Sequence, residues 1–71
     1  MFHHPGPKAA AFHKVQVMKG SGRAILCLID GQDVWIPKSL LLQSDGNEVW
    51  EEGDSGTLSI PEWFALEKGL L

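Results

Sequence analysis

The sequence has little with which to build a cross-linked or membrane-spanning structure. It contains one cysteine, Cys27, in 71 residues, which argues against the disulfide-stabilised domains typical of small secreted proteins. Its longest apolar runs, residues 24–29 and 40–42, fall far short of the roughly 20 residues that cross a bilayer. The N-terminus lacks the apolar core of a secretory signal. We therefore expect a cytoplasmic protein, in the bacterial or host-cell cytosol, with no membrane partner.

Charge is divided unevenly along the chain. Residues 1–24 contain no acid, whereas residues 25–71 contain nine acids against Lys38 and Lys68. The balance is +4 in the first part and −7 in the second, which gives the net charge of −3. Such an acidic surface repels phosphate backbones and suits a basic protein partner or a nucleic-acid mimic, although it also serves simply as a solvated surface. The four early cations are Lys8, Lys14, Lys19 and Arg23.

The sequence also lacks the arrangements that enzymes use. No glycines have the spacing of a nucleotide-binding loop, and Ser39 beside Lys38 has neither a partner histidine nor the Ser-x-x-Lys spacing. His3 and His4, with only His13 to join them, fall short of a structural metal site. The remaining carboxylates are of the kind that turns use routinely. We therefore expect no enzymatic activity, no cofactor and no metal; the carboxylates considered are Asp30, Asp33, Glu51, Glu52 and Asp54.

The first segment predicts an arm followed by a strand. Residues 1–10 are rich in proline, glycine and alanine and cannot bury enough apolar surface to offset the entropy of ordering. We expect a flexible arm there and a single domain over residues 11–71. From residue 12 the alternation places His13, Val15 and Val17 on one face of a strand.

The next segment predicts a hairpin. Residues 24–29 are apolar on both faces, which is typical of a central strand, and Cys27 within them is expected to be an inert buried thiol. Asp30-Gly31 follows, a dipeptide that favours the type I′ turn because both central residues need φ > 0. Residues 33–36 are therefore the predicted returning strand.

Weaker strand signals occupy the second half. Pro37 ends the preceding strand because it cannot donate a ladder hydrogen bond, and residues 38–43 fit either a turn or a further strand. Residues 49–51 and 57–60 each predict a short strand. Five short strands between glycine-rich turns predict a mainly β fold: a small SH3-like or OB-like barrel, or a bent antiparallel sheet.

A short C-terminal helix is expected at residues 60–68. Ser59 and Glu62 have the spacing of a capping box, in which each side chain pairs with a free amide at the helix start. Leu58 and Trp63 occupy the flanking staple positions, and Gly69 marks the stop. The residues expected to lie on one face, over an open end of the barrel, are Trp63, Leu66 and Leu70.

Aromatic side chains are numerous for so small a core. One or two of the three tryptophans are expected to fill the core or seal the helix, above all Trp63. Trp35 lies between Val34 and Ile36, so that Trp35 points outward if its two neighbours point inward. An exposed tryptophan beside Lys38 would act as a protein-interface anchor or as a platform for stacking nucleic-acid bases.

Two segments carry a family likeness: Val34-Trp35-Ile36-Pro37-Lys38-Ser39 and Ile60-Pro61-Glu62-Trp63-Phe64. With residues 23–31, 49–50, 53–54 and 68–70, they resemble a group of short, largely uncharacterised proteins encoded by bacteriophages and mobile elements. The resemblance covers about two thirds of the chain, residues 23–70. The chain departs from the group at Leu40, where a polar residue is expected. The resemblance implies a phage or prophage setting, with accessory roles in DNA metabolism or in interference with host defence.

These features predict a non-enzymatic accessory protein that binds a macromolecular partner, a host or phage protein, as an acidic inhibitor of a host defence factor. The alternatives are a single-stranded nucleic-acid-binding module and a structural or accessory domain. The residues predicted for the protein surface are Trp35, Lys38, Glu48, Trp50, Glu51, Glu52 and Asp54. Those predicted for a nucleic-acid surface are Lys8, Lys14, Lys19, Arg23, Trp35 and Lys38.

Overall fold

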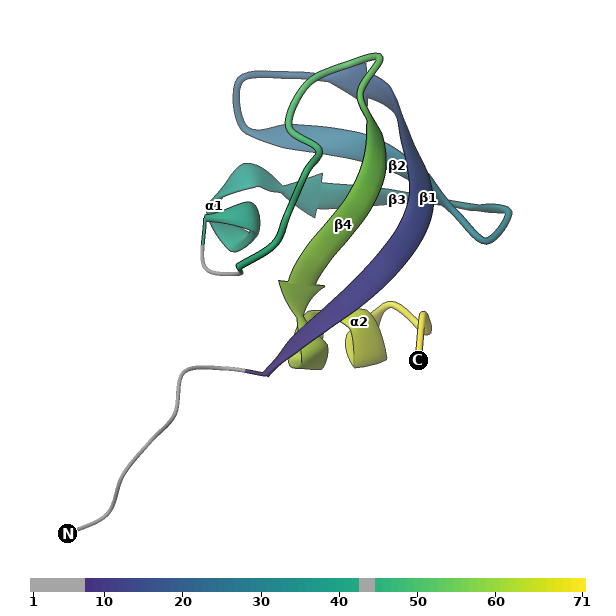
Figure 1. Cartoon of the computed structure of the whole chain (residues 1–71), viewed down its shortest axis with the longest axis vertical. Helices are drawn as coiled ribbons and strands as arrows, with labels where there is room; N and C mark the ends of the chain where they lie inside the picture. The colour runs from purple at the N-terminus through teal and green to yellow at the C-terminus, as the bar shows by residue number, and fades with distance from the viewer. Residues whose placement is uncertain (1–7, 43–44) are drawn as a thin grey trace, which may run out of the picture.

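A computed structural model describes residues 8–42 and 45–71 of the chain. Sequence predictions that fall on residues 1–7, including the paired histidines His3 and His4, and on Gln43 and Ser44 lie outside the described residues. In chain order the elements are β1 (Ala9–Gly20), β2 (Ala24–Ile29), β3 (Gln32–Pro37), α1 (Lys38–Leu41), β4 (Ser55–Pro61) and α2 (Glu62–Glu67). They form one antiparallel sheet in the order β3-β2-β1-β4 (Figure 1). The mainly β class predicted from the sequence is confirmed.

The sheet is bent because β1 contains two irregularities. Its first half pairs with β4 and its second half with β2, and the register shifts between Phe12 and Val15 and again between Val17 and Lys19. An extra residue in one strand bends that strand and increases its twist. Figure 1 accordingly shows β1 and β4 curving side by side while β2 and β3 run across them. Within the described residues β3 and β4 remain the two edges, so the predicted five-stranded barrel is replaced by an open sheet of four strands.

The β2–β3 hairpin forms as predicted. Asp30 has φ 48° and Gly31 has φ 82°, the two positive values that a type I′ turn needs. The strands then pair from Ile29 opposite Gln32 to Ala24 opposite Pro37. Val34 and Ile36 point into the core and Trp35, between them, is half exposed, as expected from the alternation.

The hydrophobic core occupies one face of the sheet. Val15 and Val17 are buried, but His13 is exposed and Phe12 packs against the core in its place. Lys14 has φ 59° in the first irregularity, and the extra residue there reverses the alternation that the sequence predicted. β1 also begins at Ala9, two residues inside the predicted arm. The strand residues that belong to the hydrophobic core cluster are Val15, Val17, Ile25, Cys27, Ile29, Val34, Ile36, Leu58 and Ile60.

The helices differ from their predictions. Residues 38–41 form a short helix, α1, where the sequence left a turn or a strand open for residues 38–43. α2 begins after Pro61 with no side-chain cap, because the amide of the buried Ser59 donates to Asn47 and the chain stays in β4 through Pro61. Phe64 and Ala65 supply the buried face of α2. Of the predicted face, Leu70 packs against the core, whereas Trp63 and Leu66 are half exposed or more.

No tryptophan fills the core, contrary to the prediction: Trp35, Trp50 and Trp63 are 50%, 37% and 50% exposed. The small core is filled instead by branched aliphatic side chains and Phe64. Among residues 8–42 and 45–71, no helix has the length and apolar character needed to cross a membrane.

Candidate functional site

A cleft of about 520 Å³ lies at one end of the β2–β3 hairpin. Three segments form it: the turn before β2, the junction of β3 with α1, and the segment that leads into β4. The lining residues are Gly22, Arg23, Pro37, Lys38, Ser39, Leu42 and Trp50. Its walls are mainly apolar, and its two charged residues, Arg23 and Lys38, are both cationic.

Arg23 and Lys38 are placed by the hairpin itself. The amide of Lys38 donates to the carbonyl of Arg23 at 2.7 Å, which extends the β2–β3 ladder by one residue pair beyond the strands. Residues directly opposite each other in an antiparallel ladder lie on the same face. Side chains alternate between the two faces along a strand, so the pair Arg23 and Lys38 lies on the same face as the pair two positions away, the buried Ile25 and Ile36. Arg23 and Lys38 therefore continue the core face at the point where it reaches solvent.

Trp50 comes from the segment between α1 and β4. Residues 49–51 of this segment were predicted to form a short strand and instead lie in an irregular loop. Asp54 orders this loop: one of its carboxylate oxygens, Oδ2, accepts hydrogen bonds from the amides of Trp50 at 2.9 Å and Glu51 at 2.8 Å. The amides of Glu51 and Trp50 lower the pKa of Asp54 below its usual value of 3.8, because they stabilise the charged form. The loop thus holds Trp50 so that Lys38 Nζ lies 5.1 Å from the centroid of its ring.

Further bonds fix the same loop to the sheet. The amide of Gly53 donates to the carbonyl of Val17, and the amide of Val17 donates to the carbonyl of Asp54, both at 2.9 Å. At the other edge, Glu48 Oε1 accepts a bond of 2.8 Å from the amide of Thr57. The Trp50 loop is therefore attached to both β1 and β4 and is part of the folded domain.

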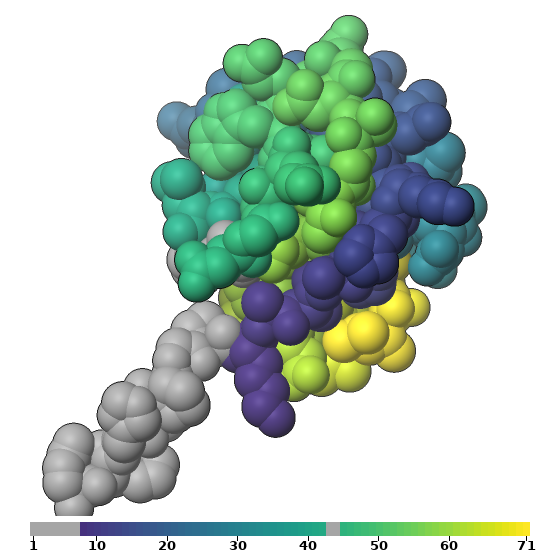
Figure 2. Space-filling view, viewed as in Figure 1, coloured from purple at the N-terminus to yellow at the C-terminus, as the bar shows by residue number. Residues whose placement is uncertain are grey.

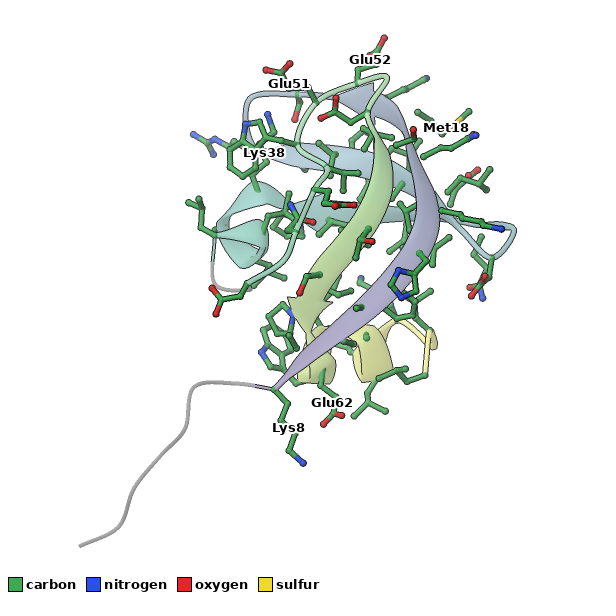
Figure 3. The ribbon with its side chains drawn as sticks, in the orientation of Figure 1. Lys8, Met18, Lys38, Glu51, Glu52 and Glu62 are labelled. Atoms are coloured by element: carbon green, nitrogen blue, oxygen red, sulfur yellow. The ribbon has the colours of Figure 1, made fainter. Side chains whose placement is uncertain are left out.

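These bonds divide the acids of the predicted protein surface into two kinds. Glu48 and Asp54 are engaged in holding backbone amides, while Glu51 and Glu52 are exposed. Figure 3 shows Glu51 and Glu52 projecting from the top of the molecule, above Lys38. Glu48 is exposed as well, so Glu51 and Glu52 differ from it in that their carboxylates hold no backbone amide of the described residues.

Trp35 lies outside the cleft, on the outer face of the sheet. It is paired with Leu26 of β2, and Leu26 is paired in turn with Lys19 of β1. These three residues form a row across three strands, which we call the Trp35 row. Next to it along β2 is Leu28, which is partly exposed, and Met18, at the second irregularity of β1, is 49% exposed. The row carries an apolar surface with one cation at its end.

The cations predicted for a nucleic-acid surface are not all brought together. Arg23 and Lys38 line the cleft and Lys19 ends the Trp35 row. Lys8 lies at the opposite end of the molecule from Lys38 (Figure 3), where its carbonyl accepts from the amide of Glu62. Lys14 lies within the first irregularity of β1.

Several cleft residues were not predicted from the sequence: Gly22, Pro37, Ser39 and Leu42. The pairing of Arg23 with Lys38 could have been predicted from the hairpin turn. In this register the numbers of two paired residues add to 61, as those of the turn residues 30 and 31 do, and 23 and 38 also add to 61. Leu42 lines the cleft from the end of α1, and Trp50 meets the hairpin through its contact with Lys38, which no local pattern indicates.

Within the described part of the chain, no group of three or more histidine, cysteine or carboxylate side chains is close enough to hold a metal ion. Comparison with protein families, with curated proteins and with solved structures finds no match for this chain.

Proposed function

We propose that this chain is a non-enzymatic binding protein that contacts another protein through the Trp35 row and the neighbouring Trp50 cleft. The observation that carries the proposal is the position of Trp35, which is 50% exposed on a sheet face where Leu26 stands directly opposite it. Tryptophan and arginine are the side chains most often found at the energetic centre of a protein interface. The Trp35 row and the cleft supply two tryptophans and Arg23 on adjoining surfaces.

The proposal of a protein interface is supported by where the apolar side chains lie, on the outer face of β2, rather than by how many there are. Leu26 and Leu28 alternate with the buried Ile25, Cys27 and Ile29 along β2, so β2 exposes leucine where a sheet with one solvated face ordinarily carries polar residues. A partner that covered this face would bury Leu26, Leu28 and Trp35 together. Glu51 and Glu52, exposed beyond the cleft, would favour a partner with cations at that end.

The first test is capture of partners by the immobilised protein from a lysate of the cell that produces it, with the captured proteins quantified. The Trp35→Ala variant is expected to bind the partner at least about 30-fold more weakly, because truncating a hot-spot side chain costs about 2 kcal/mol or more. Trp63→Ala is the matched control, since Trp63 is equally exposed but belongs to α2, which packs on β4 and β1. Figure 2 shows α2 in yellow at the end of the molecule opposite the Trp50 loop in green.

Charge reversal at Glu51 and Glu52 is the second arm of this test, and it should weaken capture of a basic partner while Glu67→Lys leaves it unchanged. A set of captured proteins identical for wild type, Trp35→Ala and the Glu51→Lys/Glu52→Lys variant would contradict the proposed surface. A failure to capture any protein above an empty support would contradict protein binding itself.

A second candidate function, binding of single-stranded nucleic acid, is favoured by one observation. Lys19, Arg23 and Lys38 gather near the two exposed indoles Trp35 and Trp50, the combination that stacks bases and neutralises phosphates. The same end of the molecule also exposes Glu51 and Glu52, which repel phosphates. We therefore rank this candidate below protein binding.

The salt dependence of binding tests this second candidate. Three phosphate contacts would weaken binding of a labelled single-stranded DNA roughly 20-fold between about 50 and 200 mM salt. Lys38→Gln should reduce that dependence, and Lys68→Gln should not, because Lys68 also lies over an aromatic ring, Phe64 at 5.4 Å, but at the end of α2. Absence of binding at low salt would eliminate nucleic acid as the ligand.

We further propose the setting that the resemblance over residues 23–70 implies: an accessory protein of a phage or mobile element, acting in the cytosol on a host factor. Inhibition of that factor is the expected effect. The support for this setting is the resemblance alone, and the identity of the captured partner tests it, since capture only of proteins unconnected with defence or DNA metabolism would contradict it.

A further inference from the structure

The Trp50 cleft differs in chemistry from the Trp35 row, and the difference indicates what each would bind. The Trp35 row is an open face with leucines beside the indole. The cleft is a depression whose walls are Pro37, Leu42 and the face of Trp50, with Arg23 and Lys38 as its charged lining residues. A ligand that fits it must offer an apolar group to the walls and an anion to the two cations.

We propose that the cleft is the anchor pocket for a polypeptide segment in which an apolar side chain adjoins a carboxylate. This inference rests on the proposed function, protein binding, and names the ligand of one part of its surface. The apolar side chain would lie against Trp50 and Leu42, and the carboxylate would lie between Arg23 and Lys38. The hydrogen bond from the Lys38 amide to the Arg23 carbonyl holds the backbones of these two residues together, so both side chains start from neighbouring positions at the cleft.

Lys38 has two states available in this scheme. In the absence of a ligand its ammonium lies over the Trp50 ring, 5.1 Å from the centroid, in a cation–π contact that is weak because it is exposed to solvent. A carboxylate is a stronger partner because it carries a full negative charge and accepts a charge-assisted hydrogen bond from the ammonium. Binding would thus move Lys38 toward the carboxylate and leave more of the indole face for the apolar side chain.

Charge decides between a peptide and a nucleic acid as the occupant. A nucleic-acid strand brings a row of phosphates, and a strand that left the cleft toward the Trp50 loop would meet Glu51 and Glu52, both exposed. Residues 25–71 contain nine acids and only two lysines. A polyanion would therefore be repelled once it extended beyond the cleft. A peptide with one carboxylate and otherwise neutral or basic neighbours satisfies the two cations without this repulsion.

The experiment uses the full chain labelled with ¹⁵N and three probes. The first is a hexapeptide blocked at both ends that carries one aspartate next to one phenylalanine, the second has asparagine in place of that aspartate, and the third is a short oligothymidylate. We expect the aspartate peptide to shift the amide signals of Arg23 and Lys38 and the indole N–H signal of Trp50. The asparagine peptide should bind about tenfold more weakly, since it lacks the charge that the cations recognise.

Variants locate the effect. Arg23→Gln and Lys38→Gln should each weaken the aspartate peptide several-fold without weakening the asparagine peptide, because both cations recognise the ligand's carboxylate. Lys38→Gln also uncovers the Trp50 ring, so the asparagine peptide should bind this variant as well as or better than wild type. Trp50→Leu should weaken both peptides, and its folded state is checked from the same spectra. Trp35→Ala, outside the cleft, should leave both affinities unchanged.

The outcomes separate this inference from the proposed function. No shift with either peptide, equal binding of the two peptides, or shifts from the oligothymidylate alone would each overturn the inference. Capture of a protein partner that depends on Trp35 but not on Arg23 or Lys38 would leave the proposed function standing while the pocket failed. Peptide binding in the cleft without any captured protein would support the pocket and contradict the proposed function.

Discussion

Lys38 Nζ lies 5.1 Å from the centroid of the Trp50 ring, and the two residues belong to different parts of the chain. Lys38 begins α1 directly after β3, whereas Trp50 stands in a loop tied to β1 and β4. The contact therefore joins the hairpin to the segment that covers its end. It also places a cation at the face of an indole that is 37% exposed, which is the central feature of the cleft.

Lys38→Gln is expected to uncover the Trp50 ring. The effect is measured by acrylamide quenching of fluorescence, a neutral quencher being needed because the substitution removes a charge, in a background where Trp35 and Trp63 are replaced by phenylalanine so that only Trp50 emits. Quenching should increase while the free energy of unfolding falls by no more than about 1 kcal/mol, the range of an exposed cation–π contact. Lys19→Gln serves as the control and should leave quenching unchanged; equal quenching in the Lys38→Gln variant would mean that the contact is absent in solution.

Asp54 makes stability depend on acid pH. Its pKa is lowered by the amides of Glu51 and Trp50, so its charged form is favoured in the folded state, and the stabilisation is fully present above the unfolded pKa near 3.8. It is lost as the pH falls through the lower folded value. Asp54→Asn should therefore be less stable than wild type in urea at pH 7, with the difference shrinking below about pH 4. A pH-independent difference for Asp54→Asn would contradict the assignment.

Asn47 connects the loop to β4 through both ends of its amide. Its Nδ2 donates to the carbonyl of Val49 at 2.6 Å, and its Oδ1 accepts from the amide of Ser59 at 3.1 Å. Asn47→Ala removes both bonds in a partly buried place and should lower the free energy of unfolding by about 1–3 kcal/mol. Asn47→Asp retains the acceptor for Ser59, so chemical denaturation should show an intermediate loss; equal stability of all three proteins would exclude this role.

Cys27 is predicted to be unreactive while the protein is folded. Burial raises the pKa of its thiol to about 11, and the thiolate is the reactive form. Ellman's reagent at pH 8 should label Cys27 only after urea unfolds the chain. The raised pKa also makes stability depend on alkaline pH, because the folded state holds the thiol proton more tightly than the unfolded state does. This contribution to the free energy of unfolding is fully present below about pH 9 and is lost as the pH rises to about 11. Cys27→Ala should lose less stability over that alkaline range, and fast labelling of the native protein would refute burial.

The hairpin turn depends on glycine at residue 31. Gly31 has φ 82° with open space around its α-carbon, so alanine there would suffer only from backbone strain, about 1–2 kcal/mol. Gly22→Ala is the matched control, since Gly22 also has open space but no positive φ. Thermal unfolding should show a lower midpoint for Gly31→Ala and no decrease for Gly22→Ala. Equal midpoints would contradict the type I′ turn.

Local patterns predicted the parts of the fold that local chemistry decides. The Asp30-Gly31 turn specifies a two-residue hairpin, and its register then determines that Val34 and Ile36 face the core and Trp35 faces solvent. The same register places Arg23 opposite Lys38. Wherever a pattern was interrupted the prediction failed, as at Lys14, where one additional residue turned His13 to the surface.

The capping-box prediction failed for a different reason. Ser59 and Glu62 have the correct spacing, but β4 continues through Pro61, and the amide of Ser59 is engaged with Asn47. The helix therefore starts later, and Phe64 and Ala65 turn inward instead of Trp63. Competition from a tertiary hydrogen bond decided the outcome, and the sequence around residue 59 contains no sign of it.

The amino-acid sequence by itself determined the β class, the hairpin and its register, the buried thiol and the exposure of Trp35, because each depends on neighbours in the chain or directly across a two-residue turn. Only the tertiary structure decided that the sheet stays open, that the Trp50 segment is a loop held by Asp54, Glu48 and Asn47, and that its indole meets Lys38. These features depend on hydrogen bonds and packing between segments far apart in the chain. Their formation depends on how the whole core assembles, and no local alternation of residues encodes that.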